Sequence, residues 1–149
     1  MTQPSFQDYY PDALAHCYGC GRLNEHGHQI KSYWDGDESV CHFAPKPYHI
    51  SVPGYVYGGL LASLIDCHGT GTAAAALYKA AKALDPDAEP NTRTLTASLH
   101  VDYLKPTPLG PELEARGRIR ERSERKAIVE VTLVVNGVVT AKGDVVAVA

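Results

Sequence analysis

Apolar and polar residues alternate with a period of two through most of the last third of the chain, a pattern typical of half-buried strands. Between Leu95 and Tyr103 every second residue is apolar, which predicts a strand with Leu95, Ala97, Leu99, Val101 and Tyr103 on one face and Thr94, Thr96, Ser98, His100 and Asp102 on the other. Three more strands are predicted at 112–122, 127–135 and 138–148, the last two joined by the hairpin dipeptide Asn136-Gly137. We expect these four strands to form an antiparallel meander.

The middle of the chain has the pattern of one long helix. Gly58 and Gly59 open it, and Asp85-Pro86 ends it near Leu84. Its leucines and alanines leave little polar face, so other structure must cover most of its circumference. Two short strands, at 29–35 and 39–43 with a turn at 35–37, are predicted before it.

The order strand, strand, helix and four strands contains no internal repeat and no linker. A helix that is apolar nearly all round needs a sheet that curls about it. We therefore predict an α+β protein with a hotdog fold, in which a curved antiparallel sheet of about six strands wraps around one long central helix. The single domain spans 1–149, with an irregular lead-in over about 1–27 that packs onto it.

Composition narrows the class of protein. A chain of 149 residues buries roughly 70% of its unfolded surface, so it needs no disulfide or structural metal. With 14 basic and 17 acidic residues the net charge is −3, which gives no field that would recruit nucleic acid. We see no secretion signal and no run suited to a bilayer, so we expect a cytoplasmic protein without membrane contact.

The start of the helix is a candidate site. The amides of Gly58 and Gly59 have no partner within the helix, and the glycines let a ligand approach the backbone. Such N–H groups can stabilise the negative charge that develops on a carbonyl oxygen under attack. The alternative is that the paired glycines only allow tight helix packing.

Asp66 lies two turns further on, between apolar neighbours where a solvated carboxylate is unexpected. Ser63 and Thr70 share its helix face and could offer hydroxyls to it. The carboxylate could act as nucleophile or as general base on a water. The alternative is a structural aspartate held by a backbone turn or by a partner subunit.

Cys17-x-x-Cys20-Gly21 has the spacing of half a zinc site. A second matching pair is missing, so we expect a structural turn with reduced thiols and no metal. A redox role would need a strand followed by a helix. The residues that could otherwise complete four ligands are His16, His26, His28 and either Cys41 or His42.

Two histidines and a basic group complete the candidates. His68 points away from Asp66 on a helix, which favours a packing role, whereas His49 lies in the loop that leads to the glycines. The basic residues could bind the phosphates of a nucleotide-bearing substrate or could simply be solvated. They are Lys105, Arg120, Arg122, Arg125 and Lys126.

The order of these motifs resembles a known family, the bacterial PaaI-like thioesterases, and the second half resembles animal thioesterase-superfamily members 4 and 5. Cys17-Tyr-Gly-Cys-Gly, followed by Asn24 and Gly27, is similar to the family's N-terminal segment. Residues 49–59 resemble its His-x-x-x-Pro-Gly-x-x-His-Gly-Gly loop, and the distance from the glycines to Asp66 matches. Residues 96–106 resemble its Thr-x-x-Leu-x-x-x-Tyr-x-x-Pro strand.

The resemblance implies an enzyme that hydrolyses an acyl-CoA thioester to free acid and CoA without a metal or organic cofactor. Gly58 and Gly59 would polarise the thioester carbonyl, while Asp66 of the neighbouring subunit attacks it or activates water, and Thr96 would be an active-site hydroxyl. We expect a homodimer or a dimer of dimers, with each site at the subunit interface. Expected substrate contacts are Asn24, Ser63, Thr70, Lys105, Arg125 and Lys126.

One position departs from the family pattern: the usual histidine before the glycine pair is Tyr57. Tyr57 could alter the acyl group that is accepted or weaken activity. A second hypothesis is therefore a catalytically silent acyl-CoA binding protein of the same fold. A third, an enoyl-CoA hydratase-type enzyme, needs a paired His and Asp, for which His68 is badly placed.

Overall fold

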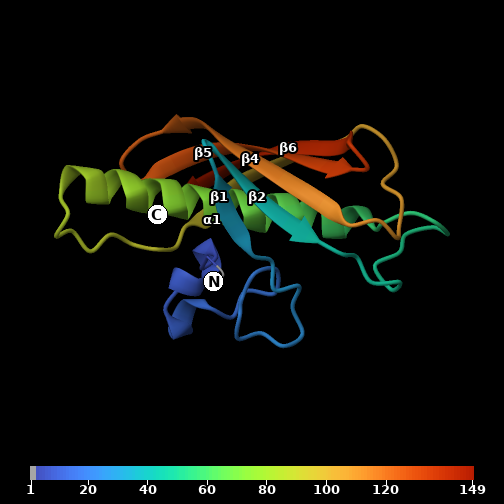
Figure 1. Cartoon of the computed structure of the whole chain (residues 1–149), viewed down its shortest axis with the longest axis horizontal. Coiled ribbons are helices and arrows are strands. Elements are labelled where there is room, and N and C mark those ends of the chain that lie inside the picture. Colours follow the sequence, from blue (N-terminus) through green and yellow to red (C-terminus); the bar gives the residue numbers. More distant parts are fainter. Residues whose placement is uncertain (1–2) are drawn as a thin grey trace.

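The computed structural model describes residues 3–149, which form one long helix and a six-stranded antiparallel sheet (Figure 1). The predicted elements are confirmed, with boundaries that move by up to three residues. Two short 3-10 helices, η1 (Phe6–Tyr9) and η2 (Asp12–Leu14), lie in the lead-in. The other elements are β1 (Ser32–Asp35), β2 (Glu38–Phe43), α1 (Gly58–Leu84), β3 (Leu95–Tyr103), β4 (Leu113–Arg122), β5 (Lys126–Val135) and β6 (Val138–Val148).

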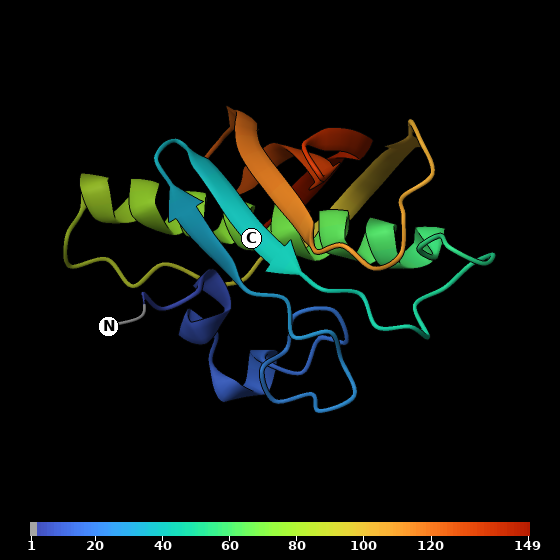
Figure 2. The ribbon, with the colours of Figure 1, turned by 45° about the vertical axis from the view of Figure 1, so that its right-hand side comes forward.

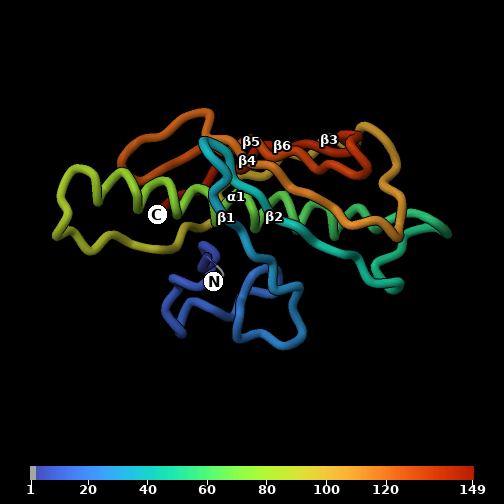
Figure 3. Tube along the Cα trace, in the orientation of Figure 1, coloured from blue at the N-terminus to red at the C-terminus, as the bar shows by residue number. Residues whose placement is uncertain are grey.

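The strand order is β1-β2-β4-β5-β6-β3, so the predicted four-strand meander is wrong at one connection. β4, β5 and β6 do form a meander, but β3 pairs with β6 at the far edge. Alternation within a strand says which residues share a face and nothing about which strand lies next to it. The loop 104–112 (Figure 3, gold loop at right) connects β3 to β4, which lie three strand spacings apart. This distance is about 14 Å, well within the span of nine residues.

The face of β3 is also corrected by the structure. The register against β6 shifts between Thr96 and Ser98, so Ala97 is an extra, bulged residue. A bulge reverses the parity of the residues before it. Thr96 therefore shares a face with Leu99 and Tyr103 instead of opposing them, and Leu95 turns outward, with 74% of its surface exposed.

Helix α1 lies between the sheet and the N-terminal lead-in (Figure 2). Leu60, Leu64 and Ile65 are buried in one core with the inward residues of β5 and β6. Close approach to β6 depends on Gly69, since a Cβ there would fall 2.5 Å from a methyl of Val145. The lead-in covers the side that the sheet leaves open, with Tyr10, Ala15 and Cys20 in the same core.

A buried polar network joins this helix to the first hairpin. His68 is fully buried, and its Nδ1 and Nε2 each lie 2.9 Å from a serine hydroxyl, Ser32 on β1 and Ser39 on β2. Gln7 donates to Ser32 at 3.2 Å, and Thr72 lies 2.7 Å from the Ser39 hydroxyl. The predicted packing role of His68 is confirmed.

Strand β3 is an exposed edge of the sheet. Among residues 3–149 only its β6 side is paired, and Leu99 and Tyr103 are 39% and 54% exposed. A long edge with exposed apolar side chains is a template for pairing with another chain.

In the part of the chain that the structure describes, the helix lacks the length of apolar sequence that a bilayer crossing requires.

Candidate active site

Asp66 lies half-buried on the side of α1 that faces β3. Its carboxylate accepts a hydrogen bond from the Thr96 hydroxyl at 2.5 Å. The β3 bulge is what turns Thr96 toward the helix, and bulges often re-aim a side chain beside an active site. The pairing of Asp66 with Thr96 thus brings together two residues thirty positions apart that were both predicted as site residues.

Ser63 and Thr70 do not support Asp66 as predicted. The Ser63 hydroxyl donates to the Gly59 carbonyl at 2.9 Å, and the Thr70 hydroxyl donates to the Cys67 carbonyl at 3.3 Å. Serine and threonine in helices commonly bond back to a preceding carbonyl, which competes with side-chain partners. These two residues serve the helix backbone instead.

The glycine pair forms the first turn of α1. Neither Gly58 nor Gly59 donates an amide hydrogen bond to another backbone group among residues 3–149. The Tyr103 hydroxyl donates to the Gly58 carbonyl at 2.8 Å, which ties the helix start to β3. The ring of Tyr57 lies against Gly59, because a Cβ on Gly59 would fall 2.4 Å from it. The two amides are available as donors, with an aromatic ring beside them.

Asp66 and the glycine amides are far apart within one chain. Eight residues separate Gly58 from Asp66, a rise of about 12 Å along the helix. A thioester carbonyl spans only about 1.2 Å, so one carbonyl cannot touch both groups of one chain. The two halves of the predicted site lie beside opposite ends of β3, one at Thr96 and the other at Tyr103.

His49 stands next to the glycine turn without reaching Asp66. Its carbonyl accepts from the Tyr57 amide at 2.9 Å, and its Nδ1 accepts from the Lys46 amide at 2.9 Å. Its ring packs against His28, Phe43 and Tyr48. Desolvation, together with the neighbouring His28 and Lys46, lowers the pKa of His49 below its usual value.

The predicted basic group is divided within the chain. Lys105 bonds to Thr140 near the beginning of β6, whereas Arg125 and Lys126 lie beside its end, next to Ala149 and Val148. The eight residues between Thr140 and Val148 span about 27 Å of strand. Closeness in sequence therefore did not produce a single phosphate site, because the two segments enter opposite ends of the sheet.

Asn24 also has a local role. Its amide nitrogen donates to the His16 carbonyl at 3.1 Å, and its oxygen accepts from the His26 amide at 3.0 Å. These bonds hold the turn that follows the cysteine pair. Contact with substrate stays a prediction for Asn24.

A cavity of about 480 Å³ lies outside this site. It lies between the lead-in and the C-terminal half of α1, lined by Phe6, Trp34 and Tyr78 with Lys79 and Lys82. Most of its helix residues, among them Gly71 and Ala75, lie roughly 120–180° around the helix from Asp66 at 100° per residue. The cavity therefore opens on the other side of the helix from the carboxylate.

Two residues of interest were missed as site residues. The sequence identified Tyr103 only as an apolar strand position and as part of a motif, although its hydroxyl donates to the Gly58 carbonyl at the helix start. Cys67 was passed over although it lies beside Cys17 and Cys20. A strand residue seven positions from Thr96 can share its face only if a bulge intervenes, and alternation alone cannot show that.

Comparisons with known proteins agree with the observed fold and identify the family. The family model of the thioesterase superfamily matches residues 53–142, from the loop before the glycines into β6. A thioesterase superfamily protein from Shewanella loihica PV-4 is 47% identical, with a TM-score of 0.69 over 92% of this chain and 96% of that one. The E. coli PaaI protein, from the phenylacetic acid degradation operon, shares the fold at 16% identity, with a TM-score of 0.59 over 80% and 82% of the two chains.

A curated relative extends the comparison to a protein with a named activity. The acyl-coenzyme A thioesterase THEM4 of Xenopus laevis is 33% identical over 87 residues. The match covers 58% of this chain and about a third of that protein, 33%. With a family match over more than half of its length and a 47% identical structural relative, this hotdog-fold chain belongs to the thioesterase superfamily.

Proposed function

We propose that the protein hydrolyses acyl-CoA thioesters to free acid and CoA, with Asp66 as the catalytic carboxylate. The observation that carries the proposal is the Asp66–Thr96 hydrogen bond next to an exposed strand edge, at the position that the family's site motif gives to the acid. The 33% identical acyl-CoA thioesterase supports the choice of substrate class. We expect the protein to act in the cytoplasm.

The 12 Å gap within one helix points to a site made by two subunits. If the β3 edges of two subunits pair antiparallel about a two-fold axis, Thr96 can lie opposite Tyr103 of the partner subunit, with the axis at His100, because the bulge at Ala97 adds one residue to the count. Since Asp66 bonds Thr96 and Gly58 bonds Tyr103, this register moves Asp66 toward the partner's Gly58. It also covers the exposed β3 edge.

The same pairing would gather the divided basic residues. The C-terminal end of β3, which leads to Lys105, would lie beside the N-terminal end of the partner's β3. That N-terminal end neighbours Arg125 and Lys126 through β6. A CoA phosphate could then meet cations from both subunits. The assembly is a homodimer or a dimer of dimers.

In the proposed reaction, the carbonyl oxygen accepts hydrogen bonds from the Gly58 and Gly59 amides of one subunit. Asp66 of the other subunit either attacks the carbonyl carbon, expelling CoA thiolate and leaving a mixed anhydride that water then hydrolyses to the free acid, or takes a proton from an attacking water. Each oxyanion donor is worth about 3 kcal/mol of transition-state stabilisation. Thr96 orients the carboxylate, and no metal or organic cofactor takes part.

The test is Asp66→Asn, which keeps the shape and removes the negative charge. We expect CoA release from a panel of acyl-CoAs to fall by at least about 100-fold, the lower range for loss of a general base. Asp37→Asn, at the exposed β1–β2 turn, is the matched control and should keep full activity. Equal rates for Asp66→Asn and the parent would refute the assignment.

One observation favours a second function, silent acyl-CoA binding: the Tyr57 ring lies against Gly59, where the substrate carbonyl would approach. That hypothesis predicts binding of an acyl-CoA without turnover, and a gain of activity in Tyr57→His. Calorimetric binding measured beside CoA release separates the two functions. The hydratase alternative would need His68 as its catalytic histidine. Both ring nitrogens of His68 are bonded to buried serines, so this residue is not free to act on a substrate.

A further inference from the structure

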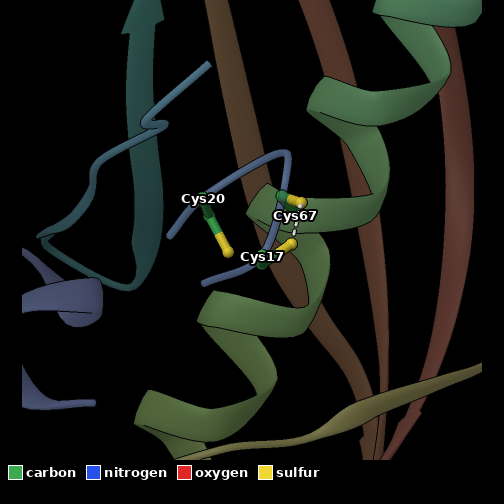
Figure 4. Close-up of side chains that lie close together, drawn as sticks. All are labelled: Cys17, Cys20 and Cys67. Carbon is green, nitrogen blue, oxygen red and sulfur yellow. Dashed lines mark hydrogen bonds between the residues drawn. The ribbon is translucent and has the colours of Figure 1, made fainter. Parts of the chain in front are cut away.

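Three of the four cysteines meet between the lead-in and the helix (Figure 4). Cys17 and Cys20 come from the lead-in, and Cys67 comes from α1, one residue after Asp66. Their sulfur atoms all lie within 4.8 Å of one another, and Cys17 Sγ is 3.8 Å from Cys67 Sγ. Cys20 and Cys67 are buried, and Cys17 is partly exposed, which leaves an approach from solvent.

The spacing of the sulfurs fits metal coordination. Thiolates bound tetrahedrally to zinc at ~2.3 Å lie about 3.8 Å apart, which is the distance found between Cys17 and Cys67. A disulfide would use two of the three sulfurs and would require them to close to about 2.05 Å. Convergence of all three is better explained by one shared ligand.

The backbone around the cluster is shaped to allow this convergence. The Gly19 amide lies 3.4 Å from Cys17 Sγ and donates to it. A Cβ on Gly19 would fall 2.3 Å from Cys67 Sγ, so a side chain there would push the helix thiol away. The Cys-x-x-Cys turn therefore donates a hydrogen bond to the Cys17 sulfur and leaves room for the Cys67 sulfur.

A cationic side chain lies beside the cluster. Arg93 Nη2 lies 3.8 Å from Cys20 Sγ. Three thiolates and the Arg93 guanidinium sum to zero net charge with Zn²⁺ and to −1 with Cu⁺. A charge-neutral group can be accommodated beside a core at lower cost than the separate ions.

We propose that Cys17, Cys20 and Cys67 bind one thiophilic closed-shell cation, Zn²⁺ or Cu⁺, which fastens the lead-in to α1. Soft thiolates select these two ions, Cu⁺ with three sulfurs alone and Zn²⁺ with a fourth ligand from solvent. Binding releases the remaining thiol protons. The site is structural and separate from the proposed hydrolysis, so either assignment can fail without the other.

The test uses the full-length protein, reduced and freed of metal, titrated separately with Zn²⁺ and Cu⁺ against a competing chromophoric chelator. We expect one equivalent to bind and a higher melting temperature for the metal-bound form. Cys67→Ala should weaken binding by about 100-fold or more, and Arg93→Gln by about 10-fold, the effect of losing an outer-shell partner. Cys41→Ala is the matched control, because Cys41 is buried outside the cluster, and it should bind like the parent.

A spectrum covers the case in which Cys67→Ala does not fold. Co²⁺ added to the parent should give a sulfur-to-cobalt charge-transfer band, and Arg93→Gln should need more Co²⁺ to reach it. Failure of the parent to bind either ion at micromolar concentration overturns the proposal. So does equal weakening by Cys41→Ala and Cys67→Ala, or a Cys17–Cys67 disulfide in air-exposed protein whose reduced form binds no metal.

Discussion

The buried histidine on α1 predicts a specific loss of stability in acid. Burial lowers the pKa of His68 to about 4 from a usual value of 6.5. The hydrogen bonds agree with a neutral ring: Gln7 donates to the Ser32 hydroxyl, which leaves the Ser32 proton for Nδ1, and Nε2–H can donate to Ser39. Protonation of Nδ1 would set two donors against each other in a site without water access.

The sign and size follow from proton linkage. Because the folded pKa is depressed, the unfolded chain binds the proton more readily, so stability is complete above pH 6.5 and is lost as the pH falls toward 4. The difference between a pKa of 6.5 in the unfolded chain and about 4 in the folded one corresponds to roughly 3 kcal/mol. Between pH 7.5 and 4.5 the loss from this group alone should be about 2.5 kcal/mol.

The assay is urea unfolding of the parent and of His68→Gln at pH 7.5 and 4.5, at equal protein concentration. Glutamine can still donate toward Ser39 but does not titrate, so the variant should start about 1–3 kcal/mol less stable at pH 7.5. Acid should then cost the parent about 2.5 kcal/mol more than it costs the variant. Equal losses in the two proteins would show that His68 does not titrate as the network requires.

Three further perturbations test other parts of the structure. Thr96→Val removes the hydrogen bond to Asp66 at nearly constant shape, which should lower kcat/KM for acyl-CoA by about 10- to 100-fold, the value of a bond to a charged group, while Thr96→Ser keeps activity. Gly117→Ala places a Cβ 2.4 Å from Ser39 Oγ, and urea unfolding should report a loss of about 1–3 kcal/mol; a loss under about 0.5 kcal/mol would contradict the close packing. Leu99→Lys, next to the centre of the proposed β3 pairing, should give monomers without turnover by light scattering and CoA release, whereas Leu84→Lys at the exposed helix end should leave the assembly intact.

Much of the fold could be predicted from the sequence because its signals are local. The apolar circumference of Gly58–Leu84 required a sheet that curls around it, and Asn136-Gly137 fixed the β5–β6 turn. The edge position of β3 could not be predicted, because the loop 104–112 is long enough to reach either neighbour. Pairing between strands depends on the whole sheet, which alternation does not encode.

For the site, likewise, individual residues could be predicted from the sequence but their contacts could not. Asp66 stood out as a carboxylate in an apolar helix, and Thr96 came from the family resemblance, yet neither could be paired without the bulge at Ala97. Ser63 and Thr70 were wrongly predicted as partners of Asp66, because helical spacing cannot distinguish a bond to a side chain from one to a preceding carbonyl. Cys67 was missed because its partners lie about fifty residues away in a segment without regular structure.

The two-turn separation between Gly58 and Asp66 has a consequence for how the proposed activity scales with enzyme concentration. If each helix gives its amides to one reaction centre and its carboxylate to another, an isolated subunit is inert, and specific activity should decline on dilution as subunits part. Two inactive variants, one without the Asp66 carboxylate and one with a side chain blocking the glycine turn, should recover part of the activity when their subunits are mixed and exchanged. One centre of every hybrid pair then combines both undamaged halves.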